Sequence, residues 1–184
     1  MRAGDEVAQT ADPFAALTNL SPDLAASMFA FGKMPYEKSR LSLREFEAAR
    51  IRTAEINGCM ICQGFRAARD LPDLLGIPAE AQHPELLDRG PAPDEAFYRD
   101  ILDWRGSAIY SARERIAIEL AERMGLDPAP LPHDSDFWGK ARSVFGEEEI
   151  ADLVISIGAW IAGGRTLHVL GLDMVCAAPV SVGP

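Results

Sequence analysis

Two cysteines separated by two residues carry the clearest chemistry in this sequence. Cys59 and Cys62 follow Asn57 and Gly58, a dipeptide that ends one helix and allows another to begin. Both thiols then fall in the first turn of the new helix, where unpaired backbone N–H groups and the helix dipole favour a thiolate. The spacing also lets the two sulfur atoms join in a disulfide. These features predict a reactive thiol pair.

Charged residues on both sides of the pair could support this chemistry. Arg66 lies four residues beyond Cys62, on the same helical face, and could place a fixed positive charge beside that sulfur. Glu47 stands in an otherwise apolar row of the preceding helix, so it lies either at the edge of the core or in position for catalysis. Glu55 is an alternative acid close by. A solvent-exposed carboxylate or a structural ion pair remains the simpler interpretation of Glu47.

Other interpretations of the cysteine pair need further residues. A zinc site would require two more ligands, and no second ligand pair is present. The remaining candidates are His83, His133, His168 and Cys176. An inert buried pair is the other alternative. His168, on the last predicted helix, is either a core histidine with satisfied hydrogen bonds or a proton relay. We expect His83 and His133 to lie on the surface.

Composition narrows the choice of partners and compartment. The chain has 184 residues, 48% of them apolar, and a net charge of -10. This acidity argues against nucleic acid or an anionic membrane surface as the main partner. The N-terminus lacks a secretory signal pattern. The most apolar stretch, Leu153 to Gly164, is twelve residues long, and a membrane span needs about twenty. Three cysteines do not resemble a secreted disulfide framework, so we expect a cytoplasmic protein without a membrane span.

The pattern of caps, breakers and apolar residues predicts an all-α fold of about seven to nine helices. Ser42 with Glu45 and Ser111 with Glu114 fit capping boxes. We expect a flexible segment over residues 1–20, one domain over 21–172 and a loose tail over 173–184. The expected helices cover residues 22–31, 43–56, 59–69, 79–87, 93–105, 112–125, 135–145 and 147–172, with a linker at 34–36.

The last expected helix is apolar on two sides. One side carries large residues, namely Ile150, Leu153, Val154, Ile157, Ile161 and Leu167. The other carries smaller ones, namely Ala151, Ile155, Gly158, Ala159, Ala162 and Gly163. A helix that is apolar on both sides is buried on both sides. In a chain of this size the second side could meet another subunit, so we expect a homo-oligomer.

The sequence around the cysteines resembles the alkylhydroperoxidase D-like (AhpD-like) and carboxymuconolactone decarboxylase superfamily. Glu47, eleven intervening residues and Cys59-x-x-Cys62 match the superfamily's Glu-x11-Cys-x-x-Cys signature, within FEAARIRTAEINGCMICQGF. The run that starts at Ser111, the run from Glu148 to Leu153 and the Ala159-Trp160 region resemble its later helices. The resemblance covers residues 20–172.

The resemblance implies an all-helical fold that assembles as dimers, trimers or hexamers. It implies that Cys62 attacks a hydroperoxide, Cys59 resolves the product and Glu47 is the distal end of a proton relay. One departure stands out, because Arg66 occupies the usual histidine position. Arginine does not exchange a proton near neutral pH. We therefore hypothesise that Arg66 holds the thiolate and pairs with Glu47. For the proton route three alternatives stay open: Glu47 acts through water or Glu55, another group such as His168 replaces the histidine, or peroxidase turnover is weak.

The resulting prediction is a thiol-dependent oxidoreductase. Cys62 and Cys59 would reduce hydroperoxides or relay electrons, an external dithiol or protein reductant would reset the disulfide, and no cofactor or metal would be required. Two alternatives stay open. One is a carbon–carbon lyase like the superfamily's lactone decarboxylases, although such chemistry does not need the cysteine pair. The other is a non-enzymatic helical oligomer with vestigial or sensing cysteines.

Overall fold

The chain folds into helices throughout the part that the computed structural model describes, residues 13–75 and 89–173. These residues form nine α-helices and two short 3-10 helices, and no strand occurs among them. The helices are α2 (Pro13–Leu20), α3 (Pro22–Lys38), α4 (Leu43–Asn57), α5 (Met60–Gly64), α6 (Ala67–Leu75), α8 (Glu95–Arg99), α9 (Ala112–Leu126), α10 (Ser135–Val144) and α11 (Glu147–Val169). The 3-10 helices are η2 (Asp100–Asp103) and η3 (Leu131–His133). The predicted all-α class is confirmed.

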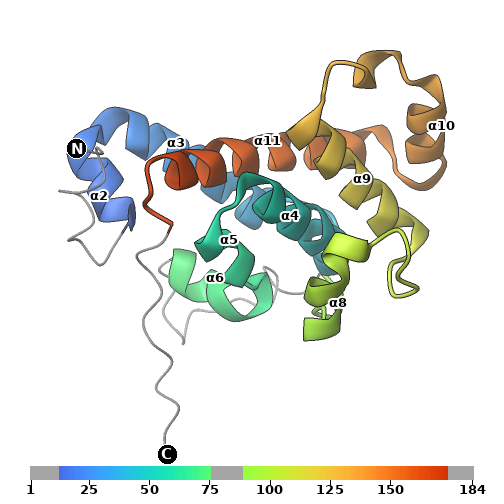
Figure 1. Cartoon of the computed structure of the whole chain (residues 1–184), viewed down its shortest axis with the longest axis horizontal. Coiled ribbons are helices and arrows are strands. Elements are labelled where there is room, and N and C mark those ends of the chain that lie inside the picture. Colours follow the sequence, from blue (N-terminus) through green and yellow to red (C-terminus); the bar gives the residue numbers. More distant parts are fainter. Residues whose placement is uncertain (1–12, 76–88, 174–184) are drawn as a thin grey trace, which may run out of the picture.

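Helices α4 and α11 form the centre of the fold. Helix α4 packs against α9 and α11, and α11 also packs against α3 (Figure 1). The short helices α5 and α6 follow α4 directly and lie on one side of it (Figure 1). The cysteine segment is therefore held between the end of α4 and the C-terminal half of α11.

Local capping signals set several helix ends as predicted. The Ser42 and Ser111 side chains each accept a hydrogen bond from the backbone of a glutamate three residues later, and that glutamate's side chain accepts one in return. Asp134 caps α10 through the backbone N–H of Phe137. Gly58 ends α4 with φ of 69°, a conformation that glycine adopts without a steric penalty. The chain can therefore turn sharply just before Cys59.

Helix α3 is longer than predicted. It continues through Gly32 and Pro35 to Lys38, so the linker expected at residues 34–36 is helical. Pro35 removes one backbone donor, but the next residue, Tyr36, packs its ring against Phe46 and Phe65, with centroids 5.3 and 5.5 Å away. Tertiary packing outweighs the helix-breaking signal here.

Other boundaries also differ from the predictions. The helix expected over 93–105 is α8 followed by the 3-10 helix η2, and α11 ends at Val169 rather than at residue 172. Residues 13–20, expected to be flexible, form α2, which buries Ala16 and Leu17. The helix expected over 59–69 is two helices, α5 and α6, with Phe65 and Arg66 between them. Pro72, expected to follow a helix end, lies inside α6. The helix expected near residues 79–87 lies outside the described residues.

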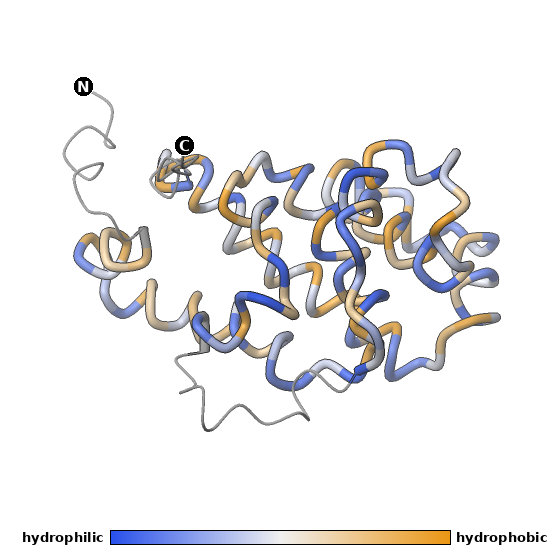
Figure 2. Tube along the Cα trace, turned by 90° about the horizontal axis from the view of Figure 1, so that it is seen from below, coloured by the Kyte–Doolittle hydropathy of each residue, from blue (hydrophilic) through white to orange (hydrophobic). Residues whose placement is uncertain are grey.

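Helix α11 supplies much of the core. Its buried residues include Ile150, Leu153, Ile157 and Leu167. Along the helices in general, hydrophobic and hydrophilic residues alternate, as expected for helices with one buried face (Figure 2). Its second side is more open, and Ile155 is 58% exposed. Among the described helices, α11 alone is long and apolar enough to cross a membrane. However, 44% of its apolar 18-residue stretch is buried inside the protein, and the core helix of a soluble protein passes the same test.

Candidate functional site

The two cysteines form a disulfide at the start of α5. Their Cα atoms are 5.3 Å apart, and the backbone N–H of Cys62 donates a 3.4 Å hydrogen bond to the Cys59 sulfur. Cys59 is completely buried, whereas Cys62 is partly exposed. The pair predicted from the sequence is therefore assembled, and its two members differ in their access to solvent.

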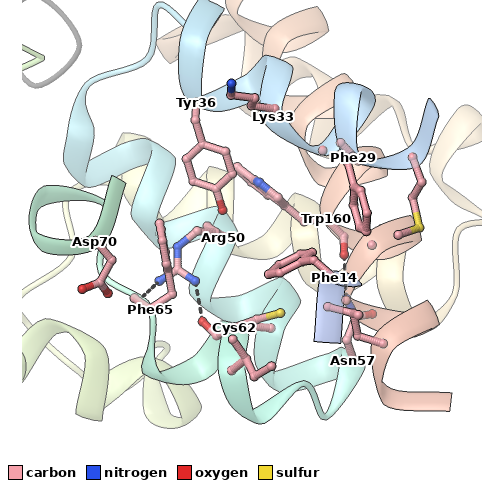
Figure 3. A pocket seen from close by; sticks show the side chains of 18 residues that line it. Phe14, Phe29, Lys33, Tyr36, Arg50, Asn57, Cys62, Phe65, Asp70 and Trp160 are labelled. Carbon is pink, nitrogen blue, oxygen red and sulfur yellow. Dashed lines mark hydrogen bonds between the residues drawn. The ribbon is translucent and has the colours of Figure 1, made fainter. Parts of the chain in front are cut away.

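A cavity of about 570 Å³ opens beside Cys62. Its volume falls within the range of about 300–1,000 Å³ found for small-molecule sites. Most of its wall is apolar, formed by Phe14, Met28, Phe29, Ile61, Phe65, Ala159, Trp160 and Leu167 (Figure 3). Polar groups are fewer and include Lys33, Tyr36, Arg50, Asn57 and Asp70. The cavity can hold an apolar molecule against the Cys62 side chain.

Glycine lets α11 approach the cysteine pair closely. A Cβ atom at Gly164 would lie 2.7 Å from Asn57 Nδ2 and 3.5 Å from Cys62 Sγ. The Asn57 side chain uses this space to donate a 2.9 Å hydrogen bond to the Trp160 carbonyl. This contact ties the end of α4 to α11 and fixes one wall of the cavity.

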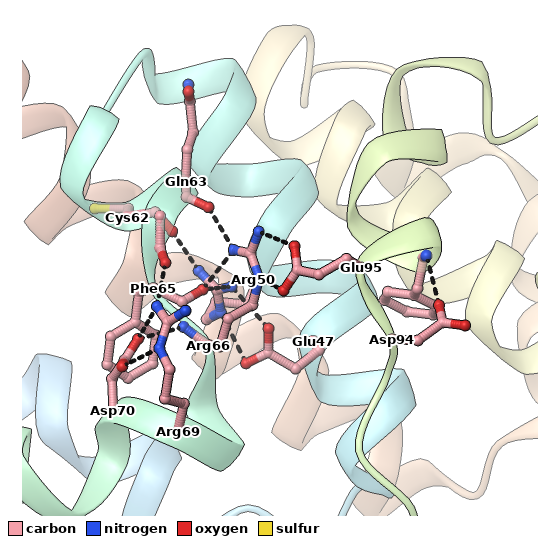
Figure 4. Close-up of polar contacts among 12 residues, drawn as sticks. Glu47, Arg50, Cys62, Gln63, Phe65, Arg66, Arg69, Asp70, Asp94 and Glu95 are labelled. Atoms are coloured by element: carbon pink, nitrogen blue, oxygen red, sulfur yellow. Dashed lines mark hydrogen bonds and ion pairs between the residues drawn. The ribbon is translucent and has the colours of Figure 1, made fainter. Parts of the chain in front are cut away.

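Glu47 lies in the protein interior and binds an arginine that the sequence analysis did not single out. Glu47 is 0% and Arg50 2% exposed, and the guanidinium donates two hydrogen bonds to the carboxylate, of 2.9 and 2.7 Å (Figure 4). Arg50 also donates to the carbonyl oxygens of Cys62, at 2.6 Å, and Phe65, at 2.7 Å. One buried ion pair therefore holds the middle of α5, at Cys62, and its C-terminal end, at Phe65. The i,i+3 spacing of Glu47 and Arg50 was the available sequence signal.

Two tyrosines border the ion pair. Burial, together with the charge of Glu47 and a hydrogen bond to its carboxylate, raises the pKa of Tyr98. Burial raises the pKa of Tyr36 to about 12, even though the charge of Arg50 acts in the opposite direction. Burial alone would lower the pKa of Arg50, but the charge of Glu47 and its hydrogen bonds raise it instead. At neutral pH both tyrosines are thus protonated and Arg50 is charged.

Arg66 does not pair with Glu47, so that hypothesis is wrong. Its guanidinium forms an ion pair with Glu95 at 3.0 Å, lies 3.8 Å over the Tyr98 ring and donates to the carbonyl oxygens of Gln63 and Phe65. The physical reason is that α5 ends at Gly64, so Arg66 is not on the helical face of Cys62. Instead it donates to the carbonyl of Gln63, in α5, and to that of Phe65, the residue that follows α5, as Figure 4 shows.

The two alternative relay residues lie apart from the Glu47–Arg50 pair. Glu55 is half-buried near the end of α4, where partial burial raises its pKa against the opposing charge of Arg52. His168 lies against Gly58, and its Nδ1 atom is 2.9 Å from Asp173 Oδ2. His133 is exposed, as expected, and His83 and Cys176 lie outside the described residues. Across residues 13–75 and 89–173, no cluster of three His, Cys, Asp or Glu residues could hold a metal ion.

Comparison with known proteins identifies the fold. No protein-family model and no curated protein matches the chain. A crystal structure of an Agrobacterium tumefaciens protein matches with a TM-score of 0.62 at 20% sequence identity, over 84% of this chain and 92% of that one. This chain has the AhpD-like fold. The Agrobacterium protein is described as one of unknown function, with a suggested role in antioxidant defence as AhpD. At this identity the match concerns the fold.

Proposed function

We propose that this AhpD-like protein is a thiol-dependent oxidoreductase that reduces organic hydroperoxides. The observation that carries the proposal is the placement of the cysteines. The Cys62 side chain lines an apolar cavity, while Cys59, its disulfide partner, is completely buried. A substrate in the cavity would reach Cys62 first, and Cys59 would be positioned to react only with Cys62.

The proposed cycle has three steps. The Cys62 thiolate attacks the terminal peroxide oxygen, the O–O bond breaks, and the products are a Cys62 sulfenic acid and, after it takes up a proton, an alcohol. The Cys59 thiol then attacks the sulfenic sulfur, which forms the disulfide and releases water. An external dithiol or a protein reductant transfers two electrons to the disulfide, which restores both thiols and oxidises the reductant. This cycle requires no metal or organic cofactor.

The buried ion pair would organise the site rather than relay protons. Arg50 stands between the Glu47 carboxylate and the Cys62 carbonyl and does not titrate near neutral pH. A proton route from Glu47 to Cys62 through this side chain is therefore blocked. We propose that the alcohol takes its proton from water in the cavity, which is open to solvent, and that Arg50 fixes the position of the Cys62 backbone.

Stoichiometric oxidation tests this function. The reduced protein is mixed with one equivalent of cumene hydroperoxide, and intact mass and peptide mapping follow the Cys59–Cys62 disulfide. We expect rapid formation in the parent chain and in the control Cys176→Ser, and none in Cys62→Ser. If neither thiol of the pair reacts, the chain is better described as a helical binding protein or as a lyase that does not use the cysteines.

We also propose a cytoplasmic homo-oligomer. The open side of α11 exposes Ala151, Ile155 and Ala162, small and apolar residues suited to contact with a second copy. Light scattering coupled to size-exclusion chromatography measures the mass directly. A single peak at the mass of one chain over the micromolar concentration range would contradict the proposed assembly.

A further inference from the structure

A buried carboxylate touches the backbone of the cysteine segment and takes no part in the cycle described above. Asp173 is 2% exposed, and its Oδ2 atom accepts a 3.2 Å hydrogen bond from the backbone N–H of Met60. That amide is bonded directly to the carbonyl carbon of Cys59. By covalent geometry the carboxylate oxygen lies within about 7 Å of the Cys59 sulfur. Asp173 is therefore a negative charge close to one member of the pair.

The turn after α11 and His168 hold Asp173 in place. The N–H groups of Gly171 and Leu172 donate to the carbonyls of His168 and Leu167, and the buried Leu172 side chain packs with Leu167. These contacts bring Asp173 back to His168, whose Nδ1 atom lies 2.9 Å from Oδ2. A carboxylate only accepts hydrogen bonds, so Nδ1 carries the proton. Because the same oxygen accepts from both His168 and Met60, its position is fixed.

We propose that Asp173, positioned by His168, keeps the Cys59 thiol protonated and so leaves Cys62 as the attacking thiolate. A nearby negative charge disfavours a second one, and complete burial of Cys59 acts in the same direction. The Cys62 N–H acts in the opposite direction, because it donates to the Cys59 sulfur. Without Asp173, Cys59 would therefore gain thiolate character. The importance of this effect for catalysis rests on the proposed redox function. The ionisation of the Cys59 thiol itself can be measured without it.

The two arginines near the cysteine pair have other partners, so the titratable group that contacts Asp173 directly is His168, 2.9 Å away. Arg50 is already paired with Glu47. Arg165 is exposed and donates to Asn57 Oδ1 and to the Gly125 carbonyl, so water screens its charge. Glu55, near the end of α4, is a second acid, and the charge of Arg52 acts on its carboxylate.

The test measures the titration of Cys59 alone. In the full chain carrying Cys62→Ser and Cys176→Ser, Cys59 is the last of the three thiols, and ultraviolet absorbance of the thiolate follows its ionisation. Adding Asp173→Asn should lower the midpoint and increase the thiolate fraction below it by about threefold to tenfold. The control Asp152→Asn removes a carboxylate within α11 that also accepts a backbone N–H, that of Arg40, and should leave the midpoint unchanged.

Variants of His168 separate electrostatics from folding. His168→Gln can still donate to Asp173 and should keep the parent midpoint, whereas His168→Ala cannot and should show part of the Asp173→Asn shift. An unchanged or higher midpoint in Asp173→Asn, with helicity retained by circular dichroism, would overturn the proposal. If Asp173→Asn does not fold, an unchanged midpoint in His168→Ala overturns it instead. The titration uses no peroxide. Its result therefore stands even if the protein fails to react with cumene hydroperoxide.

Discussion

Replacing Glu47 by Gln tests whether the buried ion pair stabilises the site. Glutamine has nearly the same shape but no charge, and among the described residues Glu47 is the one carboxylate that forms an ion pair with Arg50. The variant would leave a cation that is 2% exposed without a counter-charge. Breaking a buried ion pair by removing one partner costs about 3–5 kcal/mol. Arg50 keeps its bonds to the carbonyls of Cys62 and Phe65, so we expect the lower end of that range.

Urea unfolding followed by circular dichroism measures this cost as a change in the free energy of unfolding. Glu148→Gln is the matched control, because Glu148 pairs with Arg40 at 2.6 Å but the two side chains are 83% and 76% exposed. Exposed pairs contribute about 1 kcal/mol or less. We expect Glu47→Gln to unfold at clearly lower urea concentration than Glu148→Gln. Equal midpoints for the two variants would refute the reasoning, because burial would then make no difference to the pair.

Three further predictions concern the cavity, acid stability and Arg66. Gly163 lines the cavity, and a Cβ there meets no atom within 4 Å. Gly163→Leu should therefore slow oxidation by cumene hydroperoxide about tenfold and leave oxidation by hydrogen peroxide unchanged. Gly139→Leu, equally free of contacts at its Cβ but on α10 and outside the cavity, should change neither rate. Burial would raise the pKa of Glu122, but hydrogen bonds from Arg105 and Trp104 and the charge of Arg52 lower it to about 2. The stability from Glu122 is thus present above its ordinary pKa of 4.5 and lost as pH falls towards 2. Glu122→Gln should therefore weaken the loss of stability when urea unfolding is measured at decreasing pH. Arg66→Ala should leave the pH profile of Cys62 alkylation unchanged, and a shifted profile would restore Arg66 as a thiolate partner.

Local signals predicted the features that depend on neighbouring residues in the chain. The capping boxes at Ser42 and Ser111 involve backbone and side chains three residues apart, and both form as predicted. The break at Asn57 and Gly58 and the disulfide spacing are equally local. These signals sufficed for the all-α class and for the position of the cysteine pair.

Features that depend on tertiary contacts could not be predicted in this way. Arg50 became central because the carbonyls of Cys62 and Phe65 fold back onto α4, which no spacing in the sequence reveals. The end of α5 at Gly64 removed Arg66 from the cysteine face. The partnership of His168 with Asp173 depends on the turn at residues 170–172, where the sequence predicted that the helix continues, and on Asp173, which was expected to begin a loose tail.

The most direct test of the account traps the first oxidised cysteine. In Cys59→Ser the sulfenic acid formed on Cys62 cannot be resolved, so a sulfenic-acid reagent added with one equivalent of cumene hydroperoxide should label it, and peptide mapping identifies the labelled residue. The account predicts labelling of Cys62 in Cys59→Ser and no labelling of Cys59 in Cys62→Ser. Labelling of Cys59, or of neither cysteine, would contradict the claim that the thiol in the cavity is the one that attacks the peroxide.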